Sequence, residues 1–176
     1  MERLTRSGIG RALEALAAAL PTRDAPRELW VVGGAALVML YGARETTKDV
    51  DAFTLDAAAS AELRAAAASV ASRLGLPEDW LNDGAKGYLH GLAPGELLFS
   101  APGLVVRSVA AEQLFAMKLS AWRDDLDVSD ARLLLSKLSG DRTSVWMQVE
   151  PYLVPGRELK AQYAFDDLWE ADRGPA

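Results

Sequence analysis

The sequence predicts an α+β fold, in which a small mixed β-sheet is flanked by helices and followed by a helical C-terminal half. The predicted elements follow the order helix, strand, helix, strand, helix, two strands and then helices only. The chain has 176 residues, of which 50% are hydrophobic, so a sizeable core can form without disulfides. We expect an α/β core over residues 1–109 and a helical part over residues 110–176, packed together as one compact unit.

Helical spacing and turn residues define the elements of the first half. Alanine and leucine at helical spacing predict a first helix that ends before Pro21. Asp56 is expected to cap a long alanine-rich helix, which Gly75 closes. The expected elements are helices over residues 4–20, 35–41 and 57–74, and strands over residues 29–32 and 49–55.

The second half begins with an irregular segment and then becomes helical. Two strands are expected on either side of the tight turn Ala101-Pro102-Gly103. An acidic break at Asp124-Asp125 separates two of the helices that follow. The expected elements are an irregular segment over residues 77–95, strands over residues 96–99 and 104–109, and helices over residues 110–123, 129–138, 143–152 and 158–169.

Composition excludes several kinds of site. The chain has no cysteine and a single histidine, His90, which argues against disulfides, thiolate chemistry and a histidine zinc centre. A bound metal should therefore be a hard cation held by oxygen atoms. The net charge of -6 argues against general nucleic-acid binding. The apolar run over residues 29–43 is too short to span a bilayer, and the N-terminus lacks a signal-peptide pattern, so we expect a cytoplasmic protein without membrane contact.

The stretch over residues 30–53 carries the strongest functional signal. It reads as a strand ending in Gly33-Gly34, a short helix, and a second strand with Asp49 and Asp51. Alternate residues of a strand face the same way, and two adjacent carboxylates repel each other unless a cation binds between them. The diglycine leads into a helix N-terminus, which suits a phosphate. This combination is typical of phosphoryl or nucleotidyl transfer with Mg²⁺ or Mn²⁺ and a nucleoside triphosphate.

Other residues near this stretch have two interpretations. Arg44 and Lys48 lie in the turn before the acidic pair and would neutralise triphosphate charge, with ordinary surface charge as the alternative. Asn82 lies in the irregular segment, where no periodic pattern assigns it to a site. His90 is expected to be structural.

A lysine and two acids in the helical half are further candidates. Lys118 falls near the middle of an apolar helical face, so it either extends along that face to water or points inward toward phosphate oxygens. Asp127 is most simply the N-cap of the next helix. Asp130 shares the leucine face of that helix, which is unusual for an acid and suggests a site.

Two sequence runs resemble a known family. The run G-G-A-A-L-V-M-L-Y-G-A-R-E-T-T-K-D-V-D resembles the nucleotidyltransferase signature of the DNA polymerase β-like superfamily. The later run A-E-Q-L-F-A-M-K-L-S-A-W-R-D-D-L-D-V-S-D is similar to a second signature of its AbiEii-like branch, the type IV toxins. The resemblance covers roughly residues 29–138, and both signatures occur in the family's order.

The resemblance implies a site with two halves and a fold with a nucleotidyltransferase core. By that resemblance Gly33 and Gly34 contact nucleotide phosphates, Asp49 and Asp51 bind magnesium, Lys118 meets the triphosphate, and Asp130, with Asp127 the less clear candidate, completes the site as a distal acid. The sequence departs from the family at Gly34, where many members have serine. It also lacks the third carboxylate that they carry on a later strand, for which Glu96 is a weak substitute.

The resemblance implies a metal-dependent nucleotidyltransferase that moves a nucleoside monophosphate to an acceptor hydroxyl. Toxins of this branch act on tRNA or on a protein, and a toxin would have an antitoxin partner. Two alternatives stay open: a regulatory protein of the same fold that binds nucleotide without catalysis, and a nucleotidyltransferase that modifies a small molecule such as an antibiotic.

Overall fold

In the computed structural model, which describes residues 3–173, the chain divides into two compact units. The first comprises Met1–Lys86 and Gly95–Ser108, and the second comprises Gly87–Pro94 and Val109–Ala176. The second unit thus includes a segment that precedes the expected boundary at residue 109. The strands belong mainly to the first unit and the C-terminal helices to the second, so the α+β fold class is confirmed.

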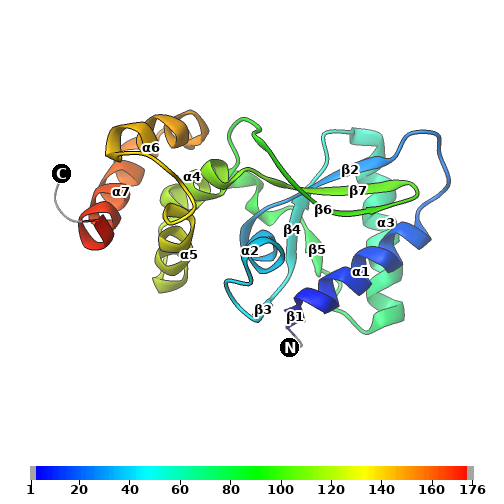
Figure 1. The fold of residues 1–176 in the computed structure, drawn as a ribbon. Coiled ribbons are helices and arrows are strands. Elements are labelled where there is room, and N and C mark those ends of the chain that lie inside the picture. The colour runs from blue at the N-terminus through cyan, green and yellow to red at the C-terminus, as the bar shows by residue number, and fades with distance from the viewer. Residues whose placement is uncertain (1–2, 174–176) are drawn as a thin grey trace. The chain divides into compact units, whose positions relative to one another are not determined.

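The first unit is built on a mixed β-sheet (Figure 1). The strands are β1 Leu4–Thr5, β2 Arg27–Val31, β3 Thr46–Thr47, β4 Val50–Phe53, β5 Leu81–Asn82, β6 Pro94–Ala101 and β7 Leu104–Val109. The main sheet has the order β5-β4-β2-β7-β6, and β1 pairs with β3 in a separate two-stranded sheet. Central strand β2 runs parallel to β7 and antiparallel to β4, which is itself parallel to β5.

Helices of the first unit cover this sheet. They are α1 Arg6–Ala19, α2 Gly33–Tyr41 and α3 Ala57–Leu74, and the 3₁₀ helix η1 Gly84–Tyr88 begins in the first unit and ends in the second. Helix α1 packs along α3, and α2 packs against β4 (Figure 1). Asp56 caps α3 by accepting from the Ala58 and Ala59 N–H groups, and Gly75 ends it in the left-handed conformation, as the sequence predicts.

Trp80 fixes the short strand β5 within the core of the first unit. Its side chain is fully buried, and its indole Nε1 donates to the Ala67 carbonyl of α3 at 3.0 Å. Its carbonyl accepts from the Val50 N–H at 2.6 Å, which ties the start of β5 to the start of β4. Trp80 therefore holds Asn82 in register beside the acidic strand.

The second unit is helical. Its helices are α4 Ala111–Ala121, α5 Asp125–Leu135, α6 Arg142–Val149, the 3₁₀ helix η2 Glu150–Tyr152 and α7 Glu158–Arg173. Helix α4 is central, since it packs against α5, α6 and α7. Phe165 of α7 contacts the rings of Phe115, Trp146 and Trp169, with centroid distances of 6.2, 5.3 and 5.6 Å. These aromatic contacts form the core between the helices.

Several expected boundaries are wrong. The acidic strand begins at Val50, so Asp49 precedes it, and the helix expected over residues 129–138 is α5, which begins four residues earlier at Asp125. Strands β1, β3 and β5 were not expected, because two residues are too few to show an alternating pattern. Within residues 3–173, no helix is both long enough and apolar enough to cross a membrane.

Candidate functional site

The sequence-predicted site residues are divided between the two units. The first unit contains Gly33, Gly34, Arg44, Lys48, Asp49 and Asp51. The second contains Lys118, Asp127 and Asp130.

Asp49 and Asp51 converge on one short segment of the first unit. Asn82 donates from its side-chain Nδ2 to Oδ2 of Asp49 at 3.3 Å, and the Ala85 N–H donates to Oδ1 of Asp51 at 3.2 Å. Asn82 lies directly opposite Asp51 in the parallel pairing of β4 with β5. The two carboxylates are half-buried, and each accepts a hydrogen bond from the segment over residues 82–85. The structure thus brings this acidic pair together although only Asp51 lies in the strand.

Two glycines allow side chains to approach the N-terminus of α2 closely. Gly33 has φ of +62°, and a Cβ there would lie 3.2 Å from Oδ2 of Asp51. A Cβ on Gly34 would lie 2.8 Å from Oγ1 of Thr47, closer than real Cβ contacts. Val32, the N-cap residue, makes no side-chain capping bond. The first turn of α2 therefore lies beside the side chains of Asp51 and Thr47, and its N-cap residue supplies no side-chain cap.

The two basic candidates of the first unit differ in placement. Arg44 is half-buried, and its Nη1 lies 3.5 Å from the position of a Cβ on Gly34, beside the helix N-terminus. Lys48 is exposed in the turn that precedes Asp49. Arg44 is therefore the basic residue that the fold brings to the diglycine.

These donors suit a hard cation that also binds phosphate oxygens. Within residues 3–173, no group of three or more histidine, cysteine or acidic side chains is placed to hold a metal ion. Mg²⁺, however, usually binds proteins through one or two carboxylates and takes its other ligands from water and substrate phosphates. The pair of Asp49 and Asp51, next to a helix N-terminus that favours anions, fits that mode.

Sequence reasoning missed two residues of this arrangement. The sequence pattern assigns no role to Asn82 or to Thr47. Both are brought to the site by pairing between distant segments: Asn82 pairs with Asp51, and Thr47 pairs with Leu4. No local pattern in the sequence predicts that these distant segments pair.

In the second unit, Lys118 is enclosed by two carboxylates. Its Nζ lies 2.8 Å from Oδ1 of Asp127 and 2.8 Å from Oδ2 of Asp130. The side chains are 12%, 2% and 4% exposed, respectively. Lys118 therefore points inward, and the ammonium does not extend to water. The negative charges that contact the Lys118 ammonium are the carboxylates of Asp127 and Asp130.

The expectation that Asp127 caps α5 is wrong. The N-cap is Asp124, whose Oδ1 accepts from the Asp127 N–H at 2.9 Å. Helix α4 ends abruptly because Trp122 adopts a left-handed conformation with φ of 39°, which is unusual for a bulky residue. This sharp turn lets α5 start early, and Asp127 falls in its first turn with its side chain toward Lys118.

Arg123 supports Asp127 from the solvent side. Its backbone N–H and its Nε donate to Oδ2 of Asp127 at 3.1 and 2.9 Å, and its Nη2 donates to Oδ1 at 3.3 Å. Burial raises the pKa of Asp127, but the hydrogen bonds from Arg123 and Lys118 and the charge of Lys118 outweigh burial and lower this pKa from 3.8 to about 2. The same contact raises the pKa of Arg123, because the ion pair favours the charged guanidinium.

The lowered pKa of Asp127 predicts an acid-sensitive second unit. A carboxyl whose pKa falls on folding stabilises the folded state above its unfolded pKa of 3.8, and this contribution is lost as pH falls through the folded pKa of about 2. We expect Asp127 to contribute about 2 kcal/mol to the free energy of unfolding above pH 4. Chemical denaturation between pH 2 and pH 5 measures this. The pH dependence should be smaller in Asp127→Asn, and an identical dependence in both proteins would contradict it.

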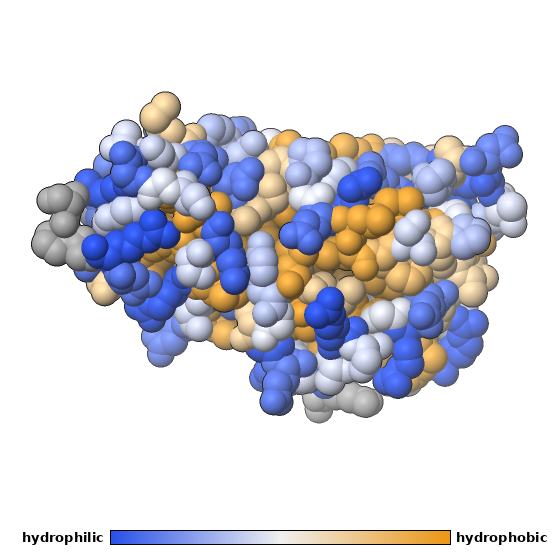
Figure 2. Space-filling model, in the orientation of Figure 1, coloured by the Kyte–Doolittle hydropathy of each residue, from blue (hydrophilic) through white to orange (hydrophobic). Residues whose placement is uncertain are grey.

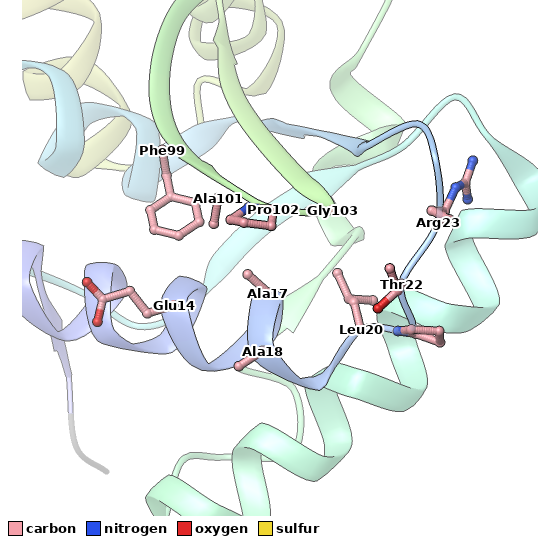
Figure 3. Close-up of a pocket in the computed structure, with 11 residues that line it drawn as sticks. Glu14, Ala17, Ala18, Leu20, Thr22, Arg23, Phe99, Ala101, Pro102 and Gly103 are labelled. Carbon is pink, nitrogen blue, oxygen red and sulfur yellow. The ribbon is translucent and has the colours of Figure 1, made fainter.

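A cavity elsewhere in the first unit contains none of the sequence-predicted site residues. It has a volume of about 460 Å³ and lies between the end of α1 and the turn of the β6–β7 hairpin (Figure 3). Phe99, Ala101 and Pro102 of the hairpin face Ala17 and Ala18 of α1 across it. Figure 2 shows apolar surface over the same hairpin. Its lining is mostly apolar, although it also includes Glu14, Thr22 and Arg23.

The chain matches no protein-family model, no curated protein and no solved structure. Its function must therefore be argued from the chemistry of its own residues and from the resemblance of its two sequence runs.

Proposed function

We propose that this protein is a metal-dependent nucleotidyltransferase of the DNA polymerase β-like superfamily, in its AbiEii-like branch. One observation carries the proposal: hydrogen bonds from Asn82 and Ala85 hold Asp49 and Asp51 at one short segment, and Gly33 lets the Asp51 carboxylate lie close to the N-terminus of α2. A carboxylate pair beside an anion-binding helix terminus is the minimum needed to hold a metal together with a polyphosphate.

Each residue of the first unit has a role in this proposal. Asp49 and Asp51 would hold Mg²⁺ or Mn²⁺, and Asn82 would orient Asp49 through its 3.3 Å hydrogen bond. The N–H groups at the start of α2 would bind phosphate oxygens, and Arg44 would offset their charge. When bound, the metal would supply Lewis-acid stabilisation of the phosphate and activation of the acceptor hydroxyl.

The acceptor is a hydroxyl of an RNA or a protein in this proposal. In the reaction the acceptor oxygen bonds to the α-phosphorus, the bond to the β-phosphate oxygen breaks, and pyrophosphate leaves with that electron pair. The acceptor proton passes to solvent or to a carboxylate. The part played by Lys118, Asp127 and Asp130 in this reaction stays a prediction.

The test is to incubate the protein with α-labelled nucleoside triphosphates, Mg²⁺ and total cellular RNA and protein. We expect label in one macromolecular fraction together with one pyrophosphate released for each nucleotide transferred. Release of label as free monophosphate, or no release of pyrophosphate with any of the four nucleotides, would contradict the proposal.

A second candidate is a nucleotide-binding regulatory protein without catalysis. The cluster of Lys118, Asp127 and Asp130 favours this candidate. A lysine whose charge is already balanced by two buried carboxylates would attract a triphosphate less strongly. Strand β7 also carries no carboxylate. Calorimetry with Mg²⁺ and nucleoside triphosphates separates the two candidates, since a regulator binds nucleotide and releases no pyrophosphate.

A further inference from the structure

We propose that the Thr47 hydroxyl is a phosphate ligand of the nucleotide site, acting at the N-terminus of α2 where the sequence has Gly34 and no side chain of its own. This inference rests on the proposed function and deepens it. It also assigns the kind of ligand, a metal-complexed polyphosphate, to the first unit.

Thr47 is buried and its hydroxyl is open. The residue is 5% exposed, and its backbone is fixed by pairing with Leu4 in the β1–β3 sheet. Within residues 3–173, the hydroxyl makes no hydrogen bond or other polar contact. Among the described residues, Oγ1 of Thr47 is not one of the side-chain atoms that are both fully buried and unpaired, so this oxygen keeps some accessible surface. A hydroxyl without a protein partner is free to donate to a bound acceptor oxygen.

The hydroxyl lies against the first turn of α2. Its Oγ1 is 2.8 Å from the position of a Cβ on Gly34, the second residue of that helix. The first N–H groups of a helix have no partner within it, and Val32 supplies no side-chain cap. The Thr47 hydroxyl therefore lies beside the turn that carries these N–H groups, and in this proposal one tetrahedral oxyanion accepts from both.

Charged side chains near the N-terminus of α2 determine which kind of anion binds there. Arg44 Nη1 lies 3.5 Å from the same Cβ position and favours an anion. Oδ2 of Asp51, however, lies 3.2 Å from the position of a Cβ on Gly33, and a carboxylate repels a bare phosphate. A metal ion between carboxylate and phosphate removes that repulsion. The site is therefore built for a polyphosphate with its metal, and free inorganic phosphate should bind poorly.

A side chain at position 34 would overlap with the side chain of Thr47. A serine at position 34 would place its Cβ 2.8 Å from Oγ1 of Thr47, so the two side chains cannot coexist without a shift. Gly34 is not in the left-handed region, so a side chain is excluded there by contact and not by backbone strain. Moving the hydroxyl from position 47 to position 34 should therefore preserve the site.

The experiment titrates the full chain with non-hydrolysable analogues of the four nucleoside triphosphates in Mg²⁺ by calorimetry. Thr47→Val removes the hydroxyl and keeps the shape, and we expect the affinity to fall about tenfold, as for a hydrogen bond to a charged group. Thr47→Ser should keep the affinity within about twofold. The double variant Gly34→Ser with Thr47→Ala should recover most of what Thr47→Ala alone loses. Thr46→Val, the neighbour in the same strand, is the matched control and should bind as wild type.

The outcomes separate this inference from the proposed function. If wild type binds an analogue and Thr47→Val binds it equally well, the inference is overturned and the proposed function stands. If wild type binds none of the analogues, both fail. Inorganic phosphate without metal should show no binding, and phosphate binding as tight as that of the triphosphate would overturn the assigned ligand class. Circular dichroism of each variant verifies that the fold is retained.

Discussion

Asp51→Asn is expected to lower nucleotidyl transfer by about 10³-fold or more, since it removes one of two charged ligands from the proposed metal site. Asparagine keeps the volume and an acceptor oxygen for the Ala85 N–H, so the hydrogen bond to η1 is preserved. The effect should therefore come from lost charge and leave the fold intact. Pyrophosphate release under saturating Mg²⁺ and nucleotide measures it.

The matched control is Asp24→Asn, which removes the same charge from an exposed residue between α1 and β2. It should keep wild-type transfer. Asp49→Asn should lower transfer about as much as Asp51→Asn does. The two carboxylates accept hydrogen bonds from Asn82 and Ala85 of the same short segment, so both belong to the proposed metal site. Unchanged transfer in either acidic variant would overturn the assignment of this pair.

Lys118→Met is expected to lower the free energy of unfolding by about 3–5 kcal/mol, the usual effect of removing one member of a buried ion pair. Methionine fills much of the volume, so loss of packing is small. The variant leaves Asp127 and Asp130 buried with no ammonium between them, although each lies 2.8 Å from Nζ in the wild type. Denaturation in guanidinium chloride at pH 7 measures the change.

The triple variant with Lys118→Met, Asp127→Asn and Asp130→Asn should recover much of this loss, because the two buried carboxylates that Lys118 contacts are then neutral. Arg123 is more than half exposed, so water can solvate it when Asp127 is neutral. A Lys118→Met variant as stable as wild type would contradict the structural role of the cluster and favour a lysine held for a ligand.

The features that the sequence predicts are those with a local cause. Asp56 and Gly75 delimit α3 because a side-chain cap and a left-handed glycine act within one turn. Helical spacing places Lys118 on an apolar face but leaves the direction of its ammonium open, and the ion pairs with Asp127 and Asp130 show that it points inward. Asp49 and Asp51 lie together even though the strand begins at Val50, since extended backbone continues their alternation.

The features that the sequence does not predict depend on pairing between distant segments. Asn82 reaches the acidic pair only because β5 joins the sheet beside β4, and Thr47 reaches α2 only because β3 pairs with β1. The role of Asp127 was misjudged for a different reason. The left-handed Trp122 ends α4 early, and a bulky residue gives no local signal for that conformation.

The central claim is that Asp49 and Asp51 hold a metal that the nucleotide needs in order to bind. Its most direct test is calorimetric titration of a non-hydrolysable nucleoside triphosphate into wild type with Mg²⁺, into wild type with a chelator, and into the double variant Asp49→Asn with Asp51→Asn. We expect the nucleotide to bind wild type in the presence of Mg²⁺. We expect it to bind at least about tenfold more weakly when the metal is chelated and when both aspartates are replaced. Equal affinity in all three would contradict it.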